Sequence, residues 1–224
     1  SASRTYDIIQ AQIRLVDDHT IEGYRVITGW AKMRKVYFRA EFSRPFNQHL
    51  MMNGGLNVCN SDVVNGRTLR AALSFNPADG QELMVKVAIS PVDNFGARTN
   101  MYAEAQSWDF DGYVKSAHDA WQRELSRIDI EGTDEQRTIF YTGFYHVLMQ
   151  PNTMSDVDGR YMDTNFEIKQ MPKGQVYHST FSLWDTFRAA HPLYTLIAPD
   201  IAAQFVRDMV LHHKTYGYLP IWDL

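Results

Sequence analysis

The sequence predicts an antiparallel β-sandwich followed by a set of helices, because the spacing of its apolar residues changes near residue 110. Before that point apolar and polar residues alternate along extended runs, and after it apolar residues recur every three or four positions. Of the 224 residues, 45% are apolar and 21% are charged. This is the composition of a globular protein with one large or two small domains.

The β half is clearest in two stretches. In Lys35–Phe42 the residues Val36, Phe38, Ala40 and Phe42 alternate with polar or mixed positions, and Leu83–Ile89 repeats the pattern. Turns are predicted between such runs at the following positions: 17–20, 53–55, 65–66 and Asp79-Gly80. One-sided apolar strands separated by turns favour two antiparallel sheets that face each other.

The helical half begins with a predicted helix over 111–128, for which Asp111 is the expected N-cap. A second helix is predicted over 134–149, where Thr133 and Gln136 have the spacing of a capping box. We therefore place a β-sandwich in residues 1–108 and a linker helix in 109–130.

Residues 131–224 are predicted to form a helical domain. It includes a polar connection over 151–178, which we expect to be a functional loop or a small hairpin. A helix over about 183–190 follows and is broken or kinked by Pro192, and another runs over about 200–215 with Gly217 as its stop. The apolar end at 221–224 leads us to expect that this domain is cut short.

The segment Tyr177–Arg188 carries the strongest chemical signal. Trp184 offers a flat face, the Asp185 carboxylate can accept two hydroxyl hydrogen bonds, and Arg188 can hold that carboxylate from one helical turn away. A sugar site needs such a set, because a pyranose has a weakly polar C–H face and a rim of hydroxyls. The alternative is a helix start in which Asp185 interacts with the helix dipole and Arg188 is its structural partner, and spacing alone favours this alternative.

The run His178–Leu193 resembles the signature of glycoside hydrolase family 92, the calcium-dependent exo-acting α-mannosidases. Four further stretches resemble the family in the same order: Arg34–Phe46, Val85–Ser90, Thr138–His146 and Ser155–Tyr161. The resemblance implies that residues 1–108 are the later part of a β-sandwich domain. It also implies that residues from 131 are the first helices of an (α/α)6 toroid, truncated before the remainder of the barrel.

The resemblance further implies an inverting, calcium-dependent exo-α-mannosidase acting on terminal mannose of N-glycans or mannans, in the periplasm or outside the cell. The catalytic acid, the catalytic base and the calcium ligands of the family are expected beyond this chain, so we assign no catalytic or metal-binding residue within it. What carries over is substrate binding. Asp185 is expected to hold mannose hydroxyls, Trp184 to shape the pocket wall and Arg188 to orient Asp185.

Two alternatives remain open from the sequence: another (α/α)6 glycosidase, and a non-catalytic carbohydrate-binding or structural fragment. Asp156 and Asp158 resemble the start of a calcium loop, but an Asp-Gly turn is the favoured interpretation because position 160 is Arg. The net charge of −4 and the lack of Lys/Arg runs argue against nucleic acid. No stretch approaches the roughly 18 apolar residues of a membrane span, and the single cysteine, Cys59, cannot form an intramolecular disulfide.

Overall fold

The computed structural model describes residues 6–29, 31–58, 61–76, 82–179 and 182–219. Cys59, the expected turn at Asp79-Gly80 and the apolar end at 221–224 lie outside the described residues. The chain divides into two compact units. The first contains the residues up to Trp108 together with Ser155–Met162, and the second contains Asp109–Met154 and the residues from Asp163 to Asp223.

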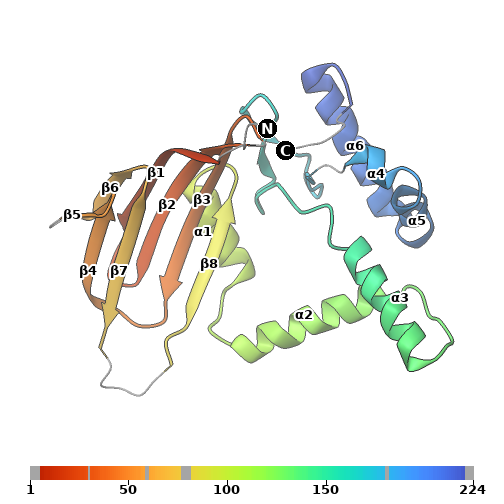
Figure 1. The fold of residues 1–224 in the computed structure, drawn as a ribbon, viewed down its shortest axis with the longest axis horizontal. Helices are drawn as coiled ribbons and strands as arrows, with labels where there is room; N and C mark the ends of the chain where they lie inside the picture. Colours follow the sequence, from red (N-terminus) through yellow and green to blue (C-terminus); the bar gives the residue numbers. More distant parts are fainter. Residues whose placement is uncertain (1–5, 30, 59–60, 77–81, 180–181, 220–224) are drawn as a thin grey trace. The chain divides into compact units, whose positions relative to one another are not determined.

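The first unit is built on two antiparallel sheets, as Figure 1 shows in red to yellow. The larger has the order β6 (Val63–Gly66), β1 (Asp7–Leu15), β2 (Thr20–Thr28), β3 (Arg34–Phe42) and β8 (Val85–Ser90). The smaller has the order β5 (Leu56–Val58), β4 (Phe46–Asn53) and β7 (Leu69–Phe75). The strands predicted over 35–42 and 83–89 are therefore confirmed as β3 and β8, and a short strand, β9 (Arg160–Met162), also belongs to this unit.

The predicted face of β3 meets the second sheet through aromatic side chains. The ring of Phe42 in β3 lies 6.2 Å from that of Phe46 in β4 and 5.3 Å from that of Phe75 in β7, centroid to centroid. In the pairing of β3 with β8, Phe38 lies opposite Ile89 and Ala40 opposite Val87, so these side chains share one face. This contact between the two sheets confirms the predicted β-sandwich.

A helix that the sequence analysis missed covers the other face of the larger sheet. Helix α1 (Asn94–Glu104) packs against β8, β3 and β2. Its buried residues are Gly96, Ala97 and Met101, which give too short an apolar stripe to stand out from the polar residues around them. Asp93 is the N-cap of α1 and accepts a hydrogen bond from the Gly96 amide at 2.6 Å.

The second unit contains helices joined by short turns and one longer connection. The helices are α2 (Phe110–Leu125), α3 (Asp134–Val147), α4 (Leu183–Thr186), α5 (Ala190–Ile197) and α6 (Pro199–Tyr216), with one short strand, β10 (Ile168–Gln170). The capping box of Thr133 and Gln136 is confirmed, as is the left-handed Gly217 that ends α6 with φ 84°. The N-cap of α2 is Asp109, whose side chain accepts from the Gly112 amide, whereas the predicted cap Asp111 lies in the first turn.

The prediction of one helix over 183–190 was wrong. Helix α4 ends at Thr186, and α5 begins at Ala190 with Pro192 in its first turn. Proline is tolerated there because the amides of a first helical turn have no partner within the helix.

The core of the second unit is an aromatic pair. Tyr194 of α5 and Phe205 of α6 are buried, with ring centroids 5.8 Å apart. Leu183 and Met209 are among the partly buried residues that pack against them. Several large apolar side chains on these helices are exposed: Val114, Ile139, Ile201 and Val210. Among the described residues, no helix has the length and apolar character needed to cross a membrane.

Candidate functional site

The three predicted substrate-binding residues lie in and directly after α4. Trp184 is 59% exposed, and Asp185 and Arg188 are also exposed. Helix α4 is a single turn in which the amides of Asp185 and Thr186 donate to the carbonyl of Ser182 at 2.9 and 3.1 Å. An aromatic face and a carboxylate are therefore presented together from one short, hydrogen-bonded turn.

Arg188 lies apart from the carboxylate that it is expected to orient. Its guanidinium carbon is 5.6 Å from the centroid of the Phe187 ring. No ion pair joins Arg188 to Asp185 within the described part of the chain. The orienting role of Arg188 thus stays a prediction.

The segment that leads into α4 is held by the backbone of residues 152–154. The Met154 amide donates to the Tyr177 carbonyl, and the Ser179 amide donates to the Asn152 carbonyl, both at 2.8 Å. The Ser179 hydroxyl accepts from the Asn152 amide at 2.9 Å. These bonds form a short antiparallel bridge around His178, which fixes the backbone of residues 177–179.

One polar residue next to this segment has no counterpart in the sequence predictions. Asp208 of α6 is 3% exposed, and its Oδ2 lies 2.9 Å from Nδ1 of His178. The only signal in the sequence is its place among other polar residues spaced by four in α6, Gln204 and His212. That pattern is typical of any solvated helix face, which explains why it was missed.

The Asp156–Gly159 turn has the structural role that the sequence favoured. Asp156 is buried and accepts hydrogen bonds from Ser90 at 2.7 Å and from Asn100 at 2.8 Å. Its burial raises the pKa of the Asp156 carboxyl above its ordinary value. Asp158 accepts from the Arg160 guanidinium at 2.8 Å. Both carboxylates are engaged by protein groups, so the loop does not present a set of free calcium ligands.

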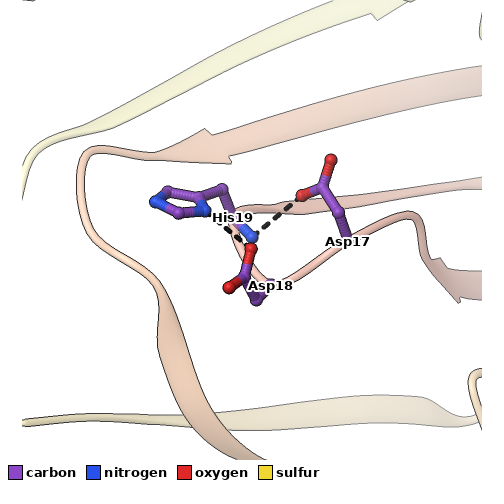
Figure 2. Close-up of side chains that lie close together, drawn as sticks. All are labelled: Asp17, Asp18 and His19. Carbon is purple, nitrogen blue, oxygen red and sulfur yellow. Dashed lines mark hydrogen bonds and ion pairs between the residues drawn. The ribbon is translucent and has the colours of Figure 1, made fainter.

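A second acidic cluster occupies the turn between β1 and β2 (Figure 2). Ligand atoms of Asp17, Asp18 and His19 lie within 4.8 Å of one another. Asp17 accepts from the His19 amide at 2.9 Å, which is the bond of an Asx turn, and Asp18 lies 2.8 Å from His19 Nδ1. Calcium takes about six to eight oxygen ligands. Two exposed carboxylates and an imidazole supply too few oxygens, so this turn does not fit calcium.

The sandwich unit also holds a polar pocket of about 360 Å³ whose lining includes Arg39, Glu41, Tyr102 and Trp108. Arg39 is buried and donates to Glu22 at 3.3 Å, to Glu41 at 3.0 Å and to Tyr102 at 3.4 Å. Arg39 and Glu41 are thus paired with each other, as expected of a structural ionic network. Asp17, which also lines this pocket, accepts from the His19 amide.

Two known family models match this chain. Residues 96–224 match the glycosyl hydrolase family 92 catalytic domain, and residues 1–90 match the family 92 N-terminal domain. The chain belongs to glycoside hydrolase family 92. The boundary between the two family 92 domains falls near α1, after the last strand of the larger sheet. A comparison with curated proteins gives no match.

Solved family 92 structures share the fold over nearly the whole chain. The α-mannosidase BT3965 from Bacteroides thetaiotaomicron is 31% identical with a TM-score of 0.90, and the match covers 96% of this chain and 30% of that one. Its complex with mannoimidazole matches at 30% identity and a TM-score of 0.90, covering 96% and 29%. The inverting mannosidase BT2199 from the same organism is 25% identical with a TM-score of 0.86, covering 95% and 30%. This chain thus spans about 30% of the length of these family 92 enzymes.

Proposed function

We propose that this chain is part of an inverting, calcium-dependent exo-α-mannosidase that removes terminal mannose from N-glycans or mannans. The observation that carries the proposal is the 31% identity and TM-score of 0.90 to a family 92 α-mannosidase, over 96% of this chain. The same enzyme has been solved with mannoimidazole. We further propose that α3 to α6 open an (α/α)6 toroid whose remaining helices are supplied by a longer polypeptide.

In this proposal α4 holds the terminal mannose in place. The Asp185 carboxylate accepts hydrogen bonds from two ring hydroxyls, and the exposed Trp184 forms part of the pocket wall. Arg188 orients the Asp185 carboxylate. These groups fix the orientation of the sugar and transfer no proton, which is a positioning contribution to catalysis.

Proton transfer and metal binding are assigned to residues outside this chain. An inverting glycosidase needs an acid for the leaving oxygen and a base for the attacking water. Among the described residues, Asp17 and Glu41 line one pocket, but Glu41 accepts from Arg39, and the cluster of Asp17, Asp18 and His19 does not fit calcium. Calcium dependence and a periplasmic or extracellular location are proposals that rest on family membership.

The test is mannose release by the intact protein from an α-linked mannobiose, with and without a calcium chelator. We expect chelator-sensitive release, with β-mannose as the first product by NMR. Asp185→Asn should lower kcat/KM about 100-fold, because the sugar is no longer held in its reactive orientation. Asp200→Asn is the matched control, since Asp200 is also an exposed acidic residue in the first turn of a helix.

Three results would contradict parts of this proposal separately. Absence of mannose release, with release from another α-glycoside, would favour a different (α/α)6 glycosidase. Release that is insensitive to the chelator would exclude the calcium requirement. Equal activity of Asp185→Asn and Asp200→Asn would show that Asp185 does not bind sugar and would favour the alternative, in which its carboxylate only interacts with the helix dipole.

A further inference from the structure

One face of α6 carries polar side chains at every fourth position. These residues are Gln204, Asp208, His212 and Tyr216, and a spacing of four places them on one side of a helix. Three of them bond to the connection that leads to α4. Gln204 donates to the Val176 carbonyl at 3.4 Å, Asp208 accepts from the His178 amide at 3.2 Å, and Tyr216 donates to the Thr164 carbonyl at 3.1 Å.

The Asp208–His178 contact is the most buried of these. Asp208 and His178 have side-chain exposures of 4% and 14%. A single oxygen of Asp208, Oδ2, faces both the backbone amide and the ring Nδ1 of His178, while Oδ1 is buried with no hydrogen-bond partner among the described residues. Because a buried carboxylate is costly unless it is well bonded, this arrangement fixes the position of His178 at the expense of stability.

The same cluster also holds α4. The ring of His178 meets that of Phe205 edge-on, with centroids 5.1 Å apart and an interplanar angle of 83°. Leu183, the first residue of α4, packs against the cluster of Phe205 and Tyr194. His178 and Leu183 therefore both pack against the cluster that contains Phe205 of α6.

We propose that His178 and Asp208 are positioning residues for the sugar-binding residue Asp185. The inference rests on the proposed function, because it assigns to Asp185 the grip on mannose. Asp208 fixes His178 by its backbone and its ring, and the shared packing of His178 and Leu183 against the Phe205 cluster passes that constraint on to α4, which carries Asp185. Neither residue touches the sugar in this scheme.

A double-mutant cycle in the intact protein tests the coupling. Asp208→Asn should lower kcat/KM for α-linked mannobiose about tenfold, and Asp185→Asn about 100-fold. The double variant should stay close to the 100-fold loss of Asp185→Asn alone. Once the Asp185 carboxylate has been replaced, moving that side chain by removing Asp208 should lower kcat/KM no further. Losses that multiply to about 1,000-fold would show that Asp208 acts independently of Asp185 and would overturn the proposal.

Replacement of His178 separates positioning from packing. Asn can place an amide donor near the position of the imidazole Nδ1, so His178→Asn should retain activity within about threefold, whereas His178→Ala should lose about tenfold. Asp200→Asn is the control that should match wild type, because Asp200 lies on α6 like Asp208 but is exposed. Equal losses in His178→Asn and His178→Ala would contradict a role for the hydrogen bond to Asp208.

Hydrogen–deuterium exchange keeps the inference testable if the intact protein releases no mannose. Peptides covering Tyr177–Ser179 and Leu183–Thr186 should exchange at least several-fold faster in Asp208→Asn than in Asp200→Asn. Unchanged exchange would refute the anchoring role. An inactive wild type with faster exchange in Asp208→Asn would refute the mannosidase proposal and keep the anchor.

Discussion

Gly96→Ala should destabilise the sandwich unit, although alanine is a better helix former than glycine. Gly96 is buried in the first turn of α1. A Cβ built on it would lie 2.0 Å from Oδ2 of Asp156 and 2.6 Å from Oγ of Ser90. Neither contact can be accommodated without displacing the Asp156 carboxylate, which is buried between Ser90 and Asn100.

The size of the effect follows from what the displacement breaks. Asp156 accepts from Ser90 at 2.7 Å and from Asn100 at 2.8 Å, and hydrogen bonds to a charged group contribute roughly 1.5–3 kcal/mol each. Partial loss of both, offset by about 1 kcal/mol of improved helix propensity, gives a net loss of about 2–3 kcal/mol. With an m-value of about 2 kcal/mol per M, the urea midpoint should fall by about 1 M.

Gly143→Ala is the matched control. Gly143 lies inside α3, and among the described residues no heavy atom outside its chain neighbours and the adjacent backbone of α3 lies within 4 Å of its Cβ position. The same substitution should therefore stabilise the second unit by up to about 1 kcal/mol. Urea unfolding of both variants, followed by hydrogen exchange in α1 and in α3, checks the pair. If Gly96→Ala were as stable as wild type while Gly143→Ala gained stability, the packing of Asp156 against α1 would be refuted.

Three further substitutions test other parts of the fold. Burial opposes ionisation of Asp93, but hydrogen bonds from Arg160 and from backbone amides outweigh burial and hold the pKa of Asp93 below its ordinary value. The stability that this carboxylate contributes is therefore present above about pH 4 and is lost as the pH falls further. Asp93→Asn should accordingly flatten the decline of the urea midpoint below about pH 4. Arg39→Met should lower the free energy of unfolding, measured in urea, by about 2 kcal/mol. This is less than the roughly 3–5 kcal/mol lost when a buried ion pair is fully broken, because Glu22 keeps its contact with Arg14. A gain in stability would contradict a stabilising role for the ionic network. Thr133→Ala should cost about 1 kcal/mol and speed hydrogen exchange at the start of α3, and unchanged exchange there would argue against the capping box.

Local rules in the sequence were enough to find the elements with strong periodicity or caps. The alternation in β3 and the spacing of Thr133 and Gln136 identify their elements because the deciding contacts lie within a few residues. Helix α1 was missed because only Gly96, Ala97 and Met101 are buried in it, which is too short an apolar stripe to show a helical period. The break between α4 and α5 was misplaced because Pro192 fits either after a helix or in the first turn of one.

The two ends of the segment Tyr177–Arg188 differ in burial. Tyr177 is buried and His178 nearly so, held by the backbone of 152–154 and by Asp208, whereas Trp184 and Asp185 are exposed on α4. A side chain that must meet substrate cannot be fixed by burial of its own, so its position has to be fixed through its neighbours along the chain. In the proposed function, the bonds made by Tyr177 and His178 therefore help to set the position from which Asp185 would bind a sugar.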